Sequence, residues 1–79
     1  MEKTRECAQQ WVNDGKPCTY QYGFSFRGAR QRPITNEEAK ERIAKKCWSF
    51  GMGFYELDWR KYEGHDVLCF NEYSENDLY

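Results

Sequence analysis

The sequence lacks any long hydrophobic run and is poor in histidine, proline and aliphatic residues. Its 79 residues include one histidine and two prolines. No stretch approaches the roughly 18 apolar residues that a membrane-spanning helix needs, so we expect no membrane partner. The first ten residues are charged and contain no apolar segment of the kind found in secretory signals, so we expect a cytoplasmic protein.

Motifs of common catalytic and cofactor sites are also missing. The chain contains no GxGxxG, P-loop or HExxH pattern. Its single histidine, His65, falls at a predicted hairpin turn beside Asp66, where a histidine is more often solvated than catalytic. A serine or cysteine partner for it would have to come from tertiary proximity. We therefore expect no enzyme, no catalytic residue and no cofactor.

The cysteines do not follow the spacing of a structural zinc site, because no C-x-x-C pair occurs. An even number in a short chain would suit a disulfide framework, but that inference needs a secretory context. Each cysteine lies on an apolar face of its predicted element. We expect buried free thiols that pack as small hydrophobic groups, with a disulfide or a bound metal as the alternatives. The four are Cys7, Cys18, Cys47 and Cys69.

Aromatic residues are abundant, with three Trp, six Tyr and five Phe. Each ring buries about 150–250 Å², which compensates for the small core of so short a chain. The net charge of −1 conceals an asymmetry: residues 1–50 carry ten Lys/Arg against six Asp/Glu (+4), and residues 51–79 carry two against seven (−5). The two halves either attract each other within the fold or present faces of opposite charge to different partners.

The most clearly marked element is a helix predicted over residues 35–48. Thr35 and Glu38 form a capping box at its beginning, and acidic and basic side chains suit the two ends of the helix dipole. Its narrow apolar face consists of Ala39, Ile43, Ala44 and Cys47. A shorter helix is predicted over residues 3–13, with one apolar stripe formed by Cys7, Ala8, Trp11 and Val12.

Residues 18–27 alternate between apolar and polar side chains, which predicts a strand with one buried face. The apolar positions are Cys18, Tyr20, Tyr22, Phe24 and Phe26. We expect these rings to point inward and fill the core. Gly23 marks a bulge or a close contact within this strand.

A hairpin is predicted from strands at residues 54–62 and 65–73, joined by a two-residue turn at Glu63-Gly64. This register places Trp59 opposite Leu68, Leu57 opposite Phe70 and Lys61 opposite Asp66. It gathers the apolar side chains into one patch, which a slip of one residue would scatter. That patch lies on one face of the hairpin and consists of Tyr55, Leu57, Trp59, Leu68 and Phe70.

The chain is therefore expected to be a single α+β domain, residues 1–79, with element order α-β-α-β-β. We predict a three-stranded sheet with the spatial order 1-3-2, packed against the helices. In it the third strand is central and antiparallel to both neighbours, as in a split β-α-β unit. Residues 74–79 form an acidic tail.

Nucleic-acid binding is one functional hypothesis, because Arg27, Arg30 and Arg32 could contact phosphates. The preceding Tyr22–Phe26 segment resembles the alternating aromatics of an RNA-recognition-motif strand, whose rings stack on bases. However, a strand with a single apolar face uses that face for the core. We therefore predict core packing of these rings over base stacking.

Protein binding is the preferred hypothesis, since Tyr, Trp and Arg are enriched at interface hot spots and the acidic half could occupy a basic groove. In its brevity, β-α-β-β unit, dense aromatics and lack of a catalytic motif, the chain resembles small phage-encoded inhibitors of bacterial defence, especially anti-CRISPR proteins. The resemblance implies surface occupation of a host protein or ribonucleoprotein complex in the host cytoplasm; it assigns no residue. The predicted contacts are Arg27, Arg30, Arg32, Glu56, Asp58, Tyr62, Glu72, Tyr73, Glu75 and Asp77.

Overall fold

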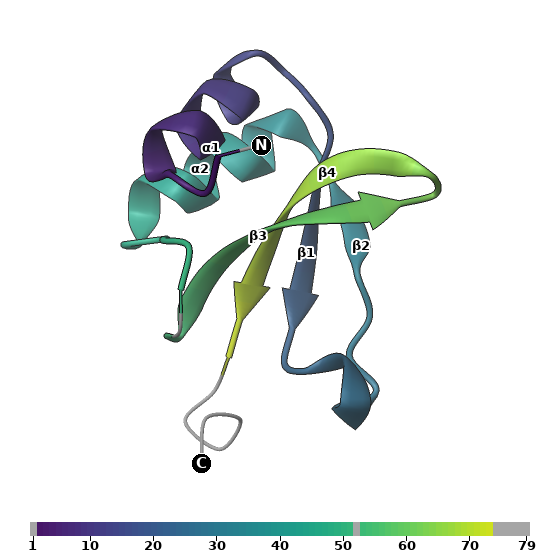
Figure 1. Cartoon of the computed structure of the whole chain (residues 1–79). Helices are drawn as coiled ribbons and strands as arrows, with labels where there is room; N and C mark the ends of the chain where they lie inside the picture. The colour runs from purple at the N-terminus through teal and green to yellow at the C-terminus, as the bar shows by residue number, and fades with distance from the viewer. Residues whose placement is uncertain (1, 52, 74–79) are drawn as a thin grey trace.

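A computed structural model gives the structure of the protein and describes residues 2–51 and 53–73 (Figure 1). Within these residues the chain forms a small α+β domain with two α-helices and a four-stranded mixed sheet. The elements are α1 (Arg5–Asn13), β1 (Cys18–Tyr22), the 3-10 turn η1 (Ser25–Arg27), β2 (Arg32–Ile34), α2 (Asn36–Lys45), β3 (Tyr55–Tyr62) and β4 (His65–Glu72). The predicted tail at residues 74–79 lies outside the described residues.

Each helix begins at a threonine cap, and the cap of α2 is the predicted one. The Thr35 hydroxyl accepts a hydrogen bond from the backbone N–H of Glu38 at 3.1 Å, and Thr4 does the same for Cys7 at 3.2 Å. A side-chain acceptor satisfies one of the backbone donors that the first helical turn leaves unpaired. The local sequence is therefore sufficient to begin both helices.

The end of α2 differs from the prediction, because the helix stops at Lys45 rather than at residue 48. Ala39 and Ile43 are buried as expected, but Ala44 and Cys47 are exposed. Trp48 takes their place in the core with 2% of its surface exposed, and its indole N–H donates to the Arg42 carbonyl at 2.6 Å. The larger side chain can reach the core only after the helix has ended.

The sheet has the order β2-β1-β4-β3 (Figure 1). The three predicted strands keep their expected spatial order, with the last one in the chain between the other two. The direction of the first strand relative to the hairpin was predicted wrongly, because β1 pairs with β4 in parallel, from Cys18 opposite Leu68 to Tyr22 opposite Glu72. The sheet also contains a fourth strand, β2, which pairs antiparallel with β1.

The missed strand explains the wrong direction. The chain reverses between β1 and β2, and α2 then crosses from β2 to β3, which are the two edge strands. Each reversal that is overlooked inverts every later strand relative to β1. With this reversal included, β4 must run parallel to β1.

The hairpin of β3 and β4 has the predicted register. Trp59 lies opposite Leu68, and Leu57 lies opposite Phe70. Both turn residues adopt positive φ, 52° at Glu63 and 82° at Gly64, as a two-residue hairpin turn requires. The outer edge of β3 is partly covered at one end, because Ser49 accepts from the Leu57 N–H at 2.9 Å.

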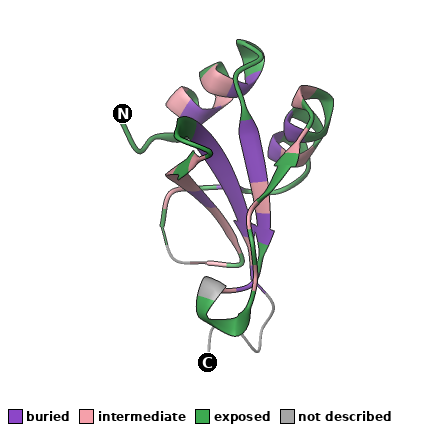
Figure 2. Ribbon diagram, turned by 90° about the vertical axis from the view of Figure 1, so that its right-hand side faces the viewer, coloured by how far each residue is buried: buried purple, intermediate pink, exposed green. Residues whose placement is uncertain are grey.

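The core lies between the two helices and one face of the sheet. Its largest side chains are those of Trp48 and Phe70, whose ring centroids are 5.0 Å apart and nearly perpendicular. Figure 2 shows buried residues along the central strands and on the inner sides of the helices. The core cluster comprises Ala8, Val12, Cys18, Ala39, Ile43, Trp48, Leu57, Leu68 and Phe70. The apolar patch predicted for the hairpin thus forms the floor of the core.

The thiols do not share one environment. Cys18 and Cys69 are buried, as predicted, but Cys7 is half-buried and Cys47 is exposed. Burial raises the pKa of Cys18 to about 12 and also raises the pKa of Cys69, so both stay protonated near neutral pH. Neither buried thiol is therefore an activated nucleophile.

Two absences concern only the part of the chain that the structure describes. Neither of its helices combines the length and apolarity needed to cross a bilayer. Its His, Cys, Asp and Glu side chains do not gather into a group of three or more that could hold a metal ion.

Candidate binding surface

Strand β1 ends five residues earlier than predicted, and this changes the position of the aromatic side chains. The chain leaves the sheet at Gly23, whose φ is 85°, and enters η1. The Gly23 N–H donates to the Glu72 carbonyl at 2.8 Å, and the Gln21 side-chain amide donates to the Gly23 carbonyl at 2.9 Å. Positive φ is accessible to glycine without a steric penalty, so Gly23 permits this exit.

The expectation that all the rings of residues 18–27 point inward is wrong. Tyr20 and Phe24 are half-buried, whereas Tyr22 is 54% exposed and Phe26 is 79% exposed. The physical reason is that the alternating pattern continues beyond the last residue of the neighbouring strand. Beyond Gly23 the described residues provide no strand to pair with, and the chain turns away from the core.

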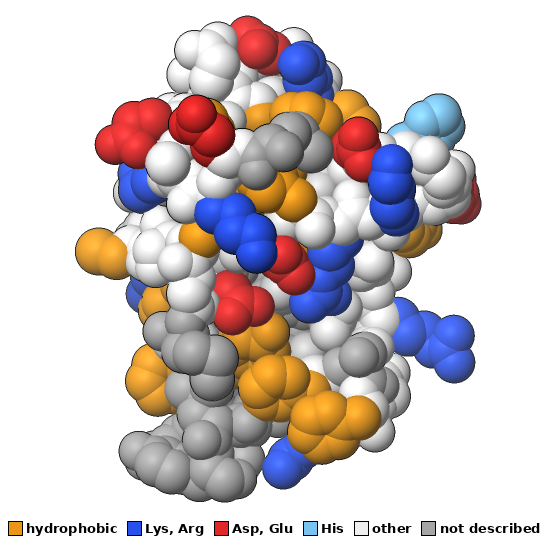
Figure 3. All heavy atoms as spheres, viewed as in Figure 1, with side chains coloured by type: hydrophobic (Ala, Val, Ile, Leu, Met, Phe, Trp, Pro, Cys, Tyr) orange, Lys and Arg blue, Asp and Glu red, His pale blue; other side chains and the backbone are white. Residues whose placement is uncertain are grey.

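Two of these rings stack with Tyr73, which follows β4, and the stack leads from the sheet to solvent. We call it the ring ladder: Tyr73, Phe24 and Phe26. The centroids of Tyr73 and Phe24 are 4.4 Å apart at 22°, and those of Phe24 and Phe26 are 5.3 Å apart at 19°. Tyr73 is buried, with 6% of its surface exposed. The ladder therefore has a fixed base and an open end. Figure 3 shows hydrophobic side chains gathered at the lower end of the molecule, where η1 lies in Figure 1.

The base of the ladder is held by hydrogen bonds. The Tyr73 hydroxyl and the Asn71 amide both donate to Oε1 of Glu56, each at 3.1 Å, and the Tyr73 N–H donates to the Phe54 carbonyl at 2.9 Å. Burial and the neighbouring Glu56 carboxylate raise the pKa of Tyr73 to about 12, so its hydroxyl remains a donor. Glu56, predicted as a partner contact, is instead occupied within the sheet.

Asp58, also predicted as a contact, is similarly engaged. One of its carboxylate oxygens accepts from Nε of Arg60 at 3.0 Å, and Nη1 of Arg60 donates to the Gln21 side chain at 2.7 Å. Arg60 thus reaches across β4 from β3 to β1. At the centre of this face of the sheet, Asn71 and Gln21 are buried. The polar groups here mainly satisfy one another.

The structure does not bring the three predicted arginines together. Arg27 lies over Phe26, with its guanidinium carbon 5.8 Å from the ring centroid, at the open end of the ladder. Arg32 lies over Tyr20 at 5.2 Å, on the core side of the sheet. Arg30 is exposed in the loop between η1 and β2. Cations over ring faces are attracted by the ring quadrupole, so both contacts are favourable.

The sequence did not indicate Arg42, a residue of α2 that also lies over Tyr20. Its guanidinium carbon lies 4.0 Å from the Tyr20 centroid. Its Nε is buried and has no hydrogen-bond partner in the described part of the structure. Burial is the main cause of the raised pKa of Tyr20, followed by the charge of Glu72. Two cations therefore lie at one tyrosine, and only the tertiary fold brings them together.

The remaining predicted contacts do not form one site. Tyr62 is half-buried at the end of the hairpin, opposite the exposed His65. Glu72 is half-buried at the end of β4. Glu75 and Asp77 lie outside the described residues. Tyr22 and Phe26 are exposed binding candidates that the analysis of the sequence assigned to the core.

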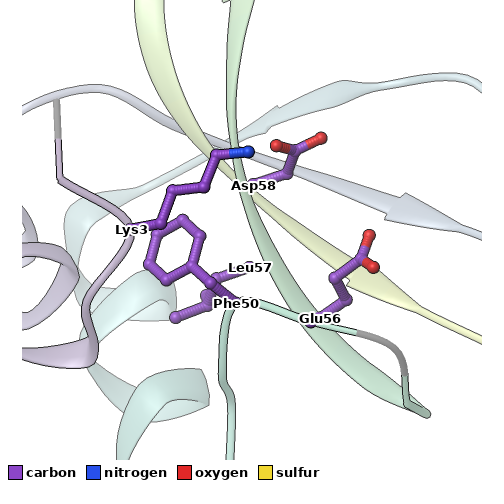
Figure 4. A pocket seen from close by; sticks show the side chains of 6 residues that line it. Lys3, Phe50, Glu56, Leu57 and Asp58 are labelled. Atoms are coloured by element: carbon purple, nitrogen blue, oxygen red, sulfur yellow. The ribbon is translucent and has the colours of Figure 1, made fainter.

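A cavity of about 320 Å³ lies beside β3, lined by Lys3, Phe50, Gly51, Glu56, Leu57 and Asp58. Figure 4 shows Lys3 extending over the Phe50 ring toward Asp58, while Glu56 projects from the strand further along. The two carboxylates already serve Arg60, Tyr73 and Asn71. Among the described residues that line this cavity, no nucleophile is paired with a base.

One signal in the sequence does coincide with the exposed rings. Residues 15–36 contain four basic residues and no acidic one. They are Lys16, Arg27, Arg30 and Arg32. The open end of the ring ladder, Tyr22 and the exposed arginines all fall within this stretch. The exposed aromatic rings thus lie in a stretch of the chain whose charged side chains are all basic.

Comparisons with family models, with curated proteins and with solved structures found no match to this chain.

Proposed function

We propose that the protein is a non-enzymatic binding domain for single-stranded nucleic acid. Its binding surface consists of the open end of the ring ladder, Tyr22 and the arginines of residues 27–32. The observation that carries this proposal is the position of Phe26: its ring is 79% exposed and is stacked at 19° on Phe24. A nucleobase added to the outer face of Phe26 would extend a stack that already exists.

The stack is suited to this role because its geometry is set before the ligand arrives. Phe24 is held between Phe26 and the buried Tyr73, so little side-chain freedom remains to be lost on binding. Base stacking on an aromatic side chain contributes about 1–3 kcal/mol and tolerates any base. We therefore expect binding with little preference for sequence.

The arginines supply the electrostatic part of the proposed interaction. Arg27 lies at the outer ring, and Arg30 is exposed on the following loop. Contact with phosphates releases counterions, so the affinity should fall as salt rises, with a log–log slope of about 0.7 for each phosphate contacted in a single strand. On this account bases are held by the rings and the backbone by the arginines.

The direct test measures the fluorescence anisotropy of labelled oligothymidine and oligouridine over a range of salt concentrations. Phe26→Ala should weaken binding by about 1–3 kcal/mol. Phe54→Ala should change it little, because Phe54 is also exposed, at 45%, but is not one of the three stacked rings of the ladder. Arg30→Ala should lower the salt slope by about 0.7, whereas Lys40→Ala on α2 should not.

Two results would contradict the proposal. One is the absence of saturable binding at low salt. The other is equal loss of affinity in Phe26→Ala and Phe54→Ala, which would mean that the stacked position of Phe26 has no special role.

The second candidate is the protein-binding inhibitor expected from the resemblance to phage-encoded inhibitors, acting on a host defence complex. It is favoured by the exposure of Tyr22 and Phe26 beside arginines, since tyrosine and arginine are enriched at interface hot spots. A pull-down from a lysate of the natural host separates the two. Capture of a defined complex by the wild type and its loss in Phe26→Ala, without affinity for oligonucleotides, would support the protein partner.

A further inference from the structure

A second cavity, of about 260 Å³, opens between α1 and β3, and Trp11 and Trp59 form part of its wall. Its rim carries Glu2, Asp14 and Lys16. It lies at the opposite end of β1 from the ring ladder, because Lys16 precedes this strand and the ladder residues follow it. The cavity is therefore separate from the proposed nucleic-acid surface.

The two indole rings are fixed in a nearly edge-to-face arrangement. Their centroids are 5.2 Å apart and their planes meet at 66°. The Trp11 N–H donates to the Pro17 carbonyl at 2.8 Å, and the Trp59 N–H donates to the Glu2 carbonyl at 2.7 Å. Since both polar edges are already satisfied, each ring has only π surface and C–H edges left to offer a ligand.

The charges around these rings favour a cation. The Nζ of Lys16 lies 4.9 Å from the centroid of Trp11, so the chain itself already places an ammonium group over this ring. Glu2 and Asp14 contribute two carboxylates against this single cation. All three charged side chains are exposed, so Lys16 can leave the ring without breaking a buried contact.

We propose that the Trp11–Trp59 cavity binds a quaternary ammonium group, such as that of a trimethylated lysine side chain, which displaces Lys16 from Trp11. A quaternary ammonium is only weakly hydrated, so it loses little water on entering a cavity walled by indoles. It interacts with the ring faces through its charge, and tryptophan is the aromatic residue that binds cations best. The rim carboxylates stabilise the same charge at longer range.

The test is a calorimetric or NMR titration with N-acetyl-trimethyllysine amide and with its neutral isostere, in which carbon replaces the ammonium nitrogen. Choline serves as a third ligand, because it carries the same group without a peptide backbone. We expect the cation to bind roughly 5- to 30-fold more tightly than the neutral isostere. Tighter binding of the trimethyllysine ligand than of choline would identify a peptide source, and the reverse order would identify a small metabolite.

Two variants test the cavity itself. Trp59→Phe keeps an aromatic ring and should weaken binding of the cation several-fold while leaving binding of the neutral isostere almost unchanged. Lys16→Ala removes the internal competitor and should strengthen binding of the cation. Phe26→Ala should have no effect on this titration, which separates the inference from the proposed nucleic-acid function.

Equal affinity for the cation and its neutral isostere would overturn the proposal, because the cavity would then recognise shape and apolarity alone. A lack of binding by both the wild type and Lys16→Ala would also overturn it. Weaker binding by Lys16→Ala would contradict the displacement, since Lys16 would then belong to the binding wall.

Discussion

Two parts of this chain were predicted to form strands, and only one of them, the β3–β4 hairpin, has the predicted pairing of residues. The β3–β4 hairpin has the predicted register, and its apolar side forms the floor of the core. Residues 18–27 form a strand only as far as Tyr22, and the Tyr22 side chain is itself exposed. The difference lies in the neighbouring strands. Alternation gives a strand only where another strand supplies hydrogen bonds, and β4 ends opposite Tyr22.

The largest expected effect comes from truncating one ring in each stretch. Phe70→Ala should lower the free energy of unfolding by about 3–5 kcal/mol, because Phe70 is fully buried against Trp48. Phe26→Ala should change it by less than about 0.5 kcal/mol, since the side chain is exposed. Denaturant unfolding followed by circular dichroism measures both. Similar losses in the two variants would mean that Phe26 is part of the core after all.

A smaller effect on stability is expected at Glu56, which connects the hairpin to the base of the ring ladder. Glu56→Ala should cost about 1–3 kcal/mol of unfolding free energy, because it leaves the Tyr73 hydroxyl and the Asn71 amide without their acceptor. Glu56→Gln retains an acceptor oxygen and is the matched control. The same unfolding experiment applies. A neutral Glu56→Ala would show that water replaces the carboxylate at the base of the ladder.

The exit of the chain from the sheet can be tested at Gly23. Gly23→Ala should destabilise the protein by about 1–2 kcal/mol, because its φ of 85° is unfavourable for any residue with a Cβ atom. Gly53→Ala is the control, as φ at Gly53 is not in the left-handed range and a Cβ there would meet nothing within 4 Å. If Gly23→Ala is tolerated as well as Gly53→Ala, the exit does not depend on glycine.

The smallest effect is a dependence of stability on alkaline pH. The pKa of Tyr73 is raised from 10.0 to about 12, so the folded state holds this proton more tightly than the unfolded state. The resulting stabilisation is fully present below pH 10 and is lost between about pH 10 and 12. Cys18 contributes in the same direction from about pH 9. Tyr73→Phe should therefore reduce the slope of stability against pH, measured by denaturant unfolding at each pH, without abolishing it.

Features set by neighbours in the sequence could be predicted for this chain. The Thr35 cap depends on residues three apart, and the hairpin register depends on a two-residue turn at Glu63-Gly64. The spatial order of the three recognised strands was also predicted. These features need no knowledge of what lies on the other side of the molecule.

Features that depend on a short strand or on residues far apart in the sequence could not be predicted. Strand β2 has three residues and contains Pro33, which is allowed there because β2 is an edge strand. Three residues are too few to show alternation, so the reversal that makes β1 and β4 parallel left no visible signal.

The candidate site was likewise predicted only in part. Arg27, Arg30 and Arg32 stand out in the sequence because no acidic residue lies near them. The stacking of Phe24 on Tyr73 joins residues 49 positions apart, and the approach of Arg42 to Tyr20 depends on how α2 crosses the sheet. Such contacts become visible only when the chain is folded.

The two margins of the sheet have a consequence for the behaviour of the protein in a crowded cell. One margin is the very short β2 with its proline, and the other is β3, which is covered at one end by Ser49 and carries Arg60 and Lys61 further along. Prolines, brevity and charge each discourage another chain from adding a strand. Such a molecule can expose aromatic rings to water while its protected sheet edges disfavour edge-to-edge aggregation.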